Sequence, residues 1–160
     1  MKKIVVASFM LMLTLAFFSA CNRDQATVYE EYHKFDSLVW KRFDFQVFEV
    51  SSLEQDVSYD VEFKFRHLPE YPSKKFFFTL SVIQPDGNYR AQEYTMWLKK
   101  SGKWKSNCMG DYCDFSYTVK RHFQINQAGT YKFEFENRMP VNPLLGMIEV
   151  GLVIKKSPIE

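Results

Sequence analysis

The chain has 160 residues, of which 46% are hydrophobic and 18% aromatic, with 21 basic and 19 acidic residues. This length suits one domain, and the apolar side chains are numerous enough for a sizeable core. No block of like charge could follow a phosphate backbone, so the sequence predicts no nucleic-acid binding.

The first twenty residues have the pattern of a secretory signal peptide. Two lysines open the chain, an almost entirely apolar run extends to Phe18, and no acidic residue occurs before Asp24. A basic start, a short apolar run and small residues are typical of such peptides. The run is shorter than the about 20 apolar residues of a transmembrane helix. We predict a lipoprotein signal peptide over residues 1–20.

The apolar run stops at Cys21. The tetrapeptide Phe18-Ser19-Ala20-Cys21 resembles the bacterial lipobox, although leucine is usual where Phe18 stands. We therefore expect Cys21 to be the first residue of the exported chain and to carry its lipid, which would anchor the protein in the membrane. The alternative is an ordinary signal peptide beside an incidental cysteine. Loss of residues 1–20 would leave 21 − 2 = 19 basic and 19 acidic residues, so the exported chain is neutral.

Residues 21–36 are expected to form the lipidated N-terminus and a tether. The first of these residues are polar, and the apolar pattern that follows covers too few residues to assign a strand or a helix. A β-sandwich domain is predicted over residues 37–157. Its cleanest alternation covers residues 57–65, where every second residue is apolar. Residues 75–83 form a continuous apolar run, typical of a buried strand, and residues 89–98 indicate another strand.

Several other segments also have a period of two. The apolar side chains expected to share one face of their strands are Phe43, Phe45 and Val47; Phe115, Tyr117 and Val119; Tyr131, Phe133 and Phe135; and Ile148, Val150, Leu152 and Ile154. About eight strands separated by turn signals, with no convincing helix, predict an all-β fold: a single antiparallel β-sandwich of jelly-roll type.

Two cysteines remain after Cys21. Cys108 and Cys113 lie close in sequence in a chain expected to enter an oxidising compartment, so a structural disulfide is favoured over free thiols or a metal site. The chain would have to turn between them at Gly110-Asp111, because bridged Cα atoms lie within about 7 Å.

No catalytic constellation is visible. His33, His67 and His122 have no metal-ligand companion at a recognised spacing, and no serine or cysteine lies in a nucleophile motif. The glycines are scattered and form no phosphate-binding loop. We expect no enzyme activity, no metal and no cofactor.

The tryptophans leave two interpretations open. Most aromatic side chains should fill the core, but Trp97 is out of phase with Tyr94, Met96 and Leu98 and should face outward. Trp97 and Trp104 could stack against a sugar, which makes glycan binding the less favoured alternative. Protein interfaces rely on aromatic and arginine anchors, so Trp97 and Arg138 are the candidate partner-binding residues.

The order of several short motifs resembles a known family. The motifs are VYEEY, RHLPEYPSKKFFF, PDG, GKW, AGTYKFEF and ENRMPVNPLLGMIEVGLVIKK. Together they resemble the gliding-motility lipoprotein GldH family of Bacteroidetes across residues 28–156. Lys74-Lys75 and Lys105-Ser106 depart from the family pattern, and the cysteine pair is not one of its hallmarks.

The resemblance implies a non-enzymatic outer-membrane lipoprotein. Its partners would be envelope proteins of the gliding machinery, which is tied to type IX secretion. The residues after Cys21 contain no acidic cluster of the kind that often marks surface-exported lipoproteins of this phylum. We therefore expect the domain to face the periplasm.

Overall fold

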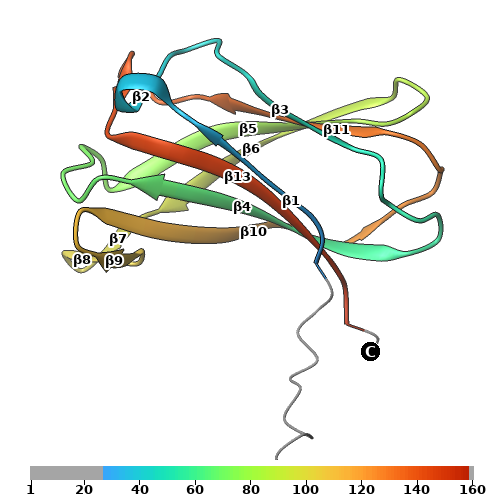
Figure 1. Ribbon diagram of the computed structural model, residues 1–160. Helices are drawn as coiled ribbons and strands as arrows, with labels where there is room; N and C mark the ends of the chain where they lie inside the picture. The colour runs from blue at the N-terminus through green and yellow to red at the C-terminus, as the bar shows by residue number, and fades with distance from the viewer. Residues whose placement is uncertain (1–26, 159–160) are drawn as a thin grey trace, which may run out of the picture.

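The computed structural model describes residues 27–158, which form two facing β-sheets (Figure 1). The five-stranded sheet contains, in order, β1 (Thr27–Lys34), β13 (Met147–Lys156), β4 (Ser58–His67), β10 (Tyr112–Gln124) and β9 (Asn107–Met109). The four-stranded sheet contains β3 (Gln46–Val50), β11 (Tyr131–Asn137), β5 (Lys75–Ile83) and β6 (Tyr89–Trp97).

Four short strands and one helical turn complete the fold. They are η2 (Asp36–Leu38), β2 (Val39–Trp40) paired with β12 (Leu144–Leu145), and β7 (Lys99–Lys100) paired with β8 (Lys103–Trp104). None of the helical structure within residues 27–158 is long and apolar enough to cross a membrane.

The strand order confirms the predicted jelly-roll sandwich. The long strands are β1, β3, β4, β5, β6, β10, β11 and β13. Numbered from one to eight in chain order, they lie as 1-8-3-6 in one sheet and 2-7-4-5 in the other, and all pairs are antiparallel. This arrangement of two interleaved Greek keys is the jelly roll.

The core lies between the sheets and is rich in phenylalanine. Alternate residues of β4 point inward, and Phe63 and Phe65 are almost completely buried. The Phe63 ring lies 4.6 Å from the Phe135 ring and 4.8 Å from the Phe78 ring, both on the opposite sheet. Such inward alternation buries large apolar area, which is the main stabilising contribution to folding.

Two details differ from the sequence predictions. The domain begins earlier than residue 37, because Thr27–Lys34 is strand β1 and pairs along its length with β13. The sequence also predicts that Phe43, Phe45 and Val47 form the apolar face of a half-buried strand, but all three are exposed. In β3 the inward residues are Gln46, Phe48 and Val50, so Val47 faces solvent. Both phases of this segment carry apolar residues, so periodicity alone could not decide between them.

The sandwich has two distinct ends. At the Thr27 end, Thr27 is opposite Lys155, and Ser52 donates a hydrogen bond to the Val28 carbonyl across the sheets. At the Trp97 end, Trp97 is opposite Lys75 and His67 is opposite Cys113. The first strand begins and the last strand ends side by side at the Thr27 end, toward the bottom of Figure 1.

Candidate functional site

Trp97 ends β6 with its side chain on the outer face of the four-stranded sheet, as its phase predicts. Met96 and Leu98 are fully buried, whereas Trp97 is 50% exposed. The Lys75 ammonium lies 3.9 Å from the centre of the Trp97 ring, from the neighbouring strand. A cation over the face of an indole is attracted by the negative face of the ring. Lys75 therefore fixes the ring and covers one of its faces.

Arg138 follows β11 at the same end of the same sheet. Its backbone N–H donates to the Phe77 carbonyl at 3.0 Å, and its guanidinium pairs with Glu136 at 3.1 Å. Phe77 is opposite Thr95, two residues from Trp97. The fold thus brings the two sequence-predicted candidates, Trp97 and Arg138, to one end of one sheet face.

Sequence reasoning missed an adjacent group of exposed apolar side chains on the N-terminal side of β3. Phe43 is 70% exposed, and Phe45 and Val47 are also exposed. The reason is local. The turn before β3 closes with a hydrogen bond from Asp44 N–H to the Lys41 carbonyl, and it holds Phe43 at a φ of 65° with its ring outside the core.

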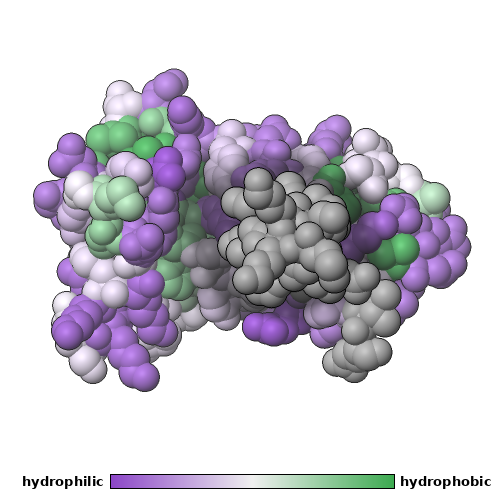
Figure 2. Space-filling view, turned by 60° about the horizontal axis from the view of Figure 1, so that its bottom comes forward, coloured by the Kyte–Doolittle hydropathy of each residue, from purple (hydrophilic) through white to green (hydrophobic). Residues whose placement is uncertain are grey.

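A shallow depression of about 290 Å³ joins the two groups, because Arg138 and Phe43 both line it. We define the aromatic patch as Phe43, Phe45, Val47, Phe77, Trp97 and Arg138. In Figure 2 the hydrophobic surface of the visible face is divided into separate patches among hydrophilic residues. Exposed apolar clusters rimmed by polar residues are typical of protein interaction sites.

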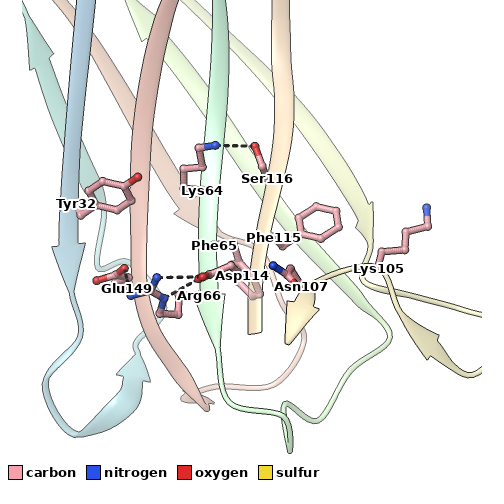
Figure 3. Close-up of a pocket in the computed structure, with 10 residues that line it drawn as sticks. All are labelled: Tyr32, Lys64, Phe65, Arg66, Lys105, Asn107, Asp114, Phe115, Ser116 and Glu149. Carbon is pink, nitrogen blue, oxygen red and sulfur yellow. Dashed lines mark hydrogen bonds and ion pairs between the residues drawn. The ribbon is translucent and has the colours of Figure 1, made fainter. Parts of the chain in front are cut away.

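Another pocket, of about 690 Å³, lies on the outer face of the other sheet (Figure 3). Arg66 is at its centre. The guanidinium donates to both Asp114 oxygens, at 2.6 and 3.0 Å, pairs with Glu149 at 3.0 Å, and lies 4.5 Å from the centre of the Tyr112 ring. These contacts, the hydrogen bond to Asp114 first, raise the pKa of Arg66.

Apart from the exposed Lys105, the charged side chains that line this pocket are paired within the protein. Lys64 pairs with Glu62 at 2.8 Å and donates to Ser116, and Glu62 also accepts from Lys155 at 3.2 Å. Burial raises the pKa of Glu62, but its two lysine partners outweigh burial and the net shift is downward. An arginine that makes a bidentate contact with one carboxylate and pairs with a second has no charge left for a ligand to neutralise. The pocket is therefore an ion-pair network that ties β4, β10 and β13 together.

His67 is a buried core residue. Its Nδ1 donates to the Leu68 carbonyl at 2.7 Å, which leaves Nε2 to accept from the Ser106 hydroxyl at 3.0 Å. Burial lowers the pKa of the imidazole. The rings of Trp104 and Tyr71 pack against it, 4.7 and 5.2 Å away. The arrangement holds one neutral tautomer inside the core and leaves no open face for a substrate.

The structure contains a disulfide between Cys108 and Cys113, whose Cα atoms are 3.9 Å apart. The two residues are directly opposite in the β9–β10 pair, and the chain turns between them through Gly110 at positive φ. The bridge closes the hairpin beside His67, which is opposite Cys113 on β4. The bridge thus has a structural role, because it joins the edge strand β9 to β10.

The other predicted residues are not gathered into a reactive site. His33 contacts Gln46 and Glu31, and the backbone of His122 bonds to Asp60. Within residues 27–158 no group of three or more histidine, cysteine or carboxylate side chains has the geometry of a metal site. Cys21 lies outside the described residues.

One of three comparisons with known proteins, the family model, agrees with the sequence resemblance. The family model described as GldH lipoprotein matches residues 27–154. A search of curated proteins finds no match. Among solved structures the chain is similar to the crystal structure of dimeric latent PorU from Porphyromonas gingivalis, with 8% identity and a TM-score of 0.32, over 87% of this chain and 14% of that chain. Because the family match extends over most of the sequence, the chain belongs to the GldH lipoprotein family.

Proposed function

We propose that this protein is a non-enzymatic, lipid-anchored component of the envelope machinery that drives gliding motility and is tied to type IX secretion. It would be attached to the outer membrane through Cys21 and would face the periplasm. Its role would be to hold a protein partner at the membrane. Membership of the GldH lipoprotein family is the observation that carries this proposal.

The aromatic patch supports a protein partner. It lies at the Trp97 end, whereas the chain that leads to Cys21 leaves from the Thr27 end. A lipid on Cys21 would therefore leave the patch turned away from the membrane. The patch combines aromatic rings with one arginine, the residue types that contribute most to binding at protein interfaces.

A lipid-anchored glycan-binding protein is the less favoured alternative. Sugar rings stack on free aromatic faces, but Lys75 covers one face of Trp97. Trp104 is half-buried between the Lys99 ammonium, 3.8 Å from its ring centre, and the His67 ring. The two tryptophans thus offer little of the flat platform that this alternative requires.

The experiment is a gene deletion complemented with wild type, with Trp97→Ala plus Arg138→Ala, or with Tyr89→Ala. Tyr89 is the matched control, because it is an exposed ring on the same face of β6 at the Thr27 end. We expect colony spreading and protein secretion to be lost in the deletion and in the double variant, and retained with Tyr89→Ala.

In-cell crosslinking and glycan arrays separate the two alternatives. Recovery of envelope motility or secretion proteins with wild type, but not with the double variant, supports the assembly role. Normal spreading and secretion in the deletion strain would refute it. Strong glycan binding that disappears in Trp97→Ala, without any protein partner, would favour the glycan-binding alternative.

A further inference from the structure

A separate pocket, of about 320 Å³, is lined by basic residues at the Thr27 end of the sandwich. It lies between the start of β6 and the end of β10. Its charged and titratable lining residues are Arg90, Lys120, Arg121 and His122. The amide side chains of Gln84, Gln124 and Asn126 complete its polar wall, and no carboxylate lines it. We refer to it as the cationic pocket.

The bulged course of β10 creates this cluster. The pairing of β10 with β4 is regular up to Thr118 and then shifts twice before Phe123. His122 has a φ of 49°, and its backbone N–H donates to the Asp60 carboxylate at 3.0 Å. Extra residues in a bulge bend the strand and re-aim side chains. Here the bulge turns consecutive basic residues toward Arg90 on the other sheet.

The basic side chains of the pocket form no ion pairs within residues 27–158, although the Asp60 carboxylate accepts the His122 backbone N–H beside them. In residues 27–158 neither Arg90 nor Arg121 forms an ion pair or a side-chain hydrogen bond with another residue. The Lys120 ammonium donates only to the neutral Gln92 amide oxygen, at 3.0 Å. Burial, followed by repulsion from Arg90, lowers the pKa of Lys120. The pocket around Arg66 has the opposite character, because each of its central charges is paired.

Like charges held together without ion-pair partners favour an anionic ligand. Guanidinium groups match phosphate oxygens in geometry, and an ammonium adds a point charge. A phosphate group therefore matches the charge and the hydrogen-bond donors of the cationic pocket. Such a group could come from a lipid headgroup or from a soluble phosphate compound.

The position of the pocket favours the lipid. Thr27 is opposite Lys155, Lys155 is opposite Asp60, and Asp60 accepts the His122 N–H. His122 is thus about three strand spacings, roughly 14 Å, from Thr27. The chain from Cys21 to Thr27 extends at most about 20 Å. A lipid on Cys21 therefore keeps the cationic pocket within reach of the headgroup layer.

From this geometry we infer that the cationic pocket binds the headgroup phosphate of an anionic lipid in the membrane that holds the anchor. The inference rests on the proposed lipid anchor for its orientation. Bound this way, the sandwich would stand on the membrane at two points, the acylated residue and the pocket. The Trp97 end, with the aromatic patch, would then point consistently toward its partner.

The test uses the exported chain with Cys21→Ser, which retains the tether and the sandwich but carries no lipid. Its binding to phosphatidylethanolamine vesicles is measured with and without phosphatidylglycerol. Arg90→Gln with Arg121→Gln should weaken binding to the phosphatidylglycerol vesicles about 25-fold, since each basic residue near an anionic surface contributes about fivefold. Arg90→Lys with Arg121→Lys keeps the charge and should retain most of the binding.

The control removes the same charge at the other end. Lys100→Gln with Lys103→Gln neutralises two opposed, exposed lysines in the β7–β8 pair at the Trp97 end. This variant should bind like the parent chain. Equal losses in the pocket and control variants, or no binding by the parent chain, would overturn the inference. Thermal melts verify that all variants are folded.

Inorganic phosphate separates the two sources of the ligand. Amide NMR shifts of residues 120–124 are followed during titration with phosphate and, separately, with phosphatidylglycerol vesicles. Shifts with vesicles support the headgroup as ligand. Shifts with phosphate, combined with no vesicle binding, would overturn it in favour of a soluble ligand. Because the tested chain has no lipid and an intact aromatic patch, these results do not depend on the partner experiment.

Discussion

Tyr32 packs its ring flat against Gly151 across the β1–β13 pair. A Cβ atom built on Gly151 would overlap Cδ1 and Cε1 of the Tyr32 ring and would lie 3.0 Å from the Glu31 carbonyl oxygen. The two residues are directly opposite in the register. The ring thus occupies the space that any other residue at position 151 would fill, and the glycine is required for the edge strand to close over the sheet.

Gly151→Ala should therefore destabilise the sandwich by about 1–3 kcal/mol, the usual cost of overpacking. In a Tyr32→Ala background the same change should cost less than about half as much, because the overlapping ring is gone. Urea unfolding of the four chains of this double-mutant cycle measures the coupling. Equal costs in both backgrounds would show that the ring simply moves aside.

Phe63→Ala should cost about 3–5 kcal/mol in free energy of unfolding, from lost burial and the cavity that remains. Phe63 is fully buried among rings from both sheets. Its neighbour Lys64 is on the outer face in an ion pair with Glu62, so Lys64→Ala should cost less than about 1 kcal/mol. Similar shifts of the urea midpoint for the two variants would contradict the assigned facing of β4.

Stability should depend on pH through His67. Burial lowers the pKa of His67 in the folded state, so the unfolded chain binds the proton more readily. The stabilisation is complete above the ordinary histidine pKa of about 6.5 and declines as pH falls toward the lowered folded pKa. The slope is at most about 1.4 kcal/mol per pH unit for one group. Urea melts should show it in the wild type and a smaller slope in His67→Gln; identical slopes would contradict it.

Removing the Cys108–Cys113 bridge should cost about 2 kcal/mol, because it closes a short loop. The comparison is Cys108→Ala with Cys113→Ala against the oxidised parent, in thermal or urea melts. Intact mass should show the parent lighter by two hydrogen atoms than its reduced form. Free thiols that react with maleimide without reductant would refute the assignment.

Cys21 should carry the lipid of the exported protein. Metabolic labelling with an alkyne fatty acid should tag the wild type and leave Cys21→Ser untagged, because the thiol is the attachment point. A prolipoprotein that keeps its first twenty residues in the variant would agree with this assignment. Equal labelling of both chains would exclude it.

The sequence predicts the central strands well and the edges poorly. β4 has partners on both sides and one face on the core, so its alternation is clean and its facing is confirmed. β1 has a partner on one side only. Glu31 lies opposite Leu152, on the core side of the sheet, but at the open edge it remains exposed and can be charged. The alternation of apolar and polar residues is therefore lost, and the sequence predicts a tether here instead of a strand. β3 has apolar residues in both phases, and its facing depends on tertiary packing.

The aromatic patch and the cationic pocket also differ in how far the sequence predicts them. The outward direction of Trp97 follows from the phase of β6 and is found in the structure. The cationic pocket is invisible in the sequence, because Arg90 lies about thirty positions from Lys120 and no basic block joins them. Only the jelly-roll connection and the bulge in β10 bring these charges together.

The pairing of Thr27 with Lys155 has a further consequence. Because the two ends of the described chain are neighbours, a short peptide could join them, and the chain could be reopened at Ser101–Gly102 between β7 and β8. Such a circular permutant would keep the long strand pairs, yet its acylated residue would sit at the opposite end. The Trp97 end would then face the membrane in place of the Thr27 end, so the orientation of the sandwich could be changed without changing its fold.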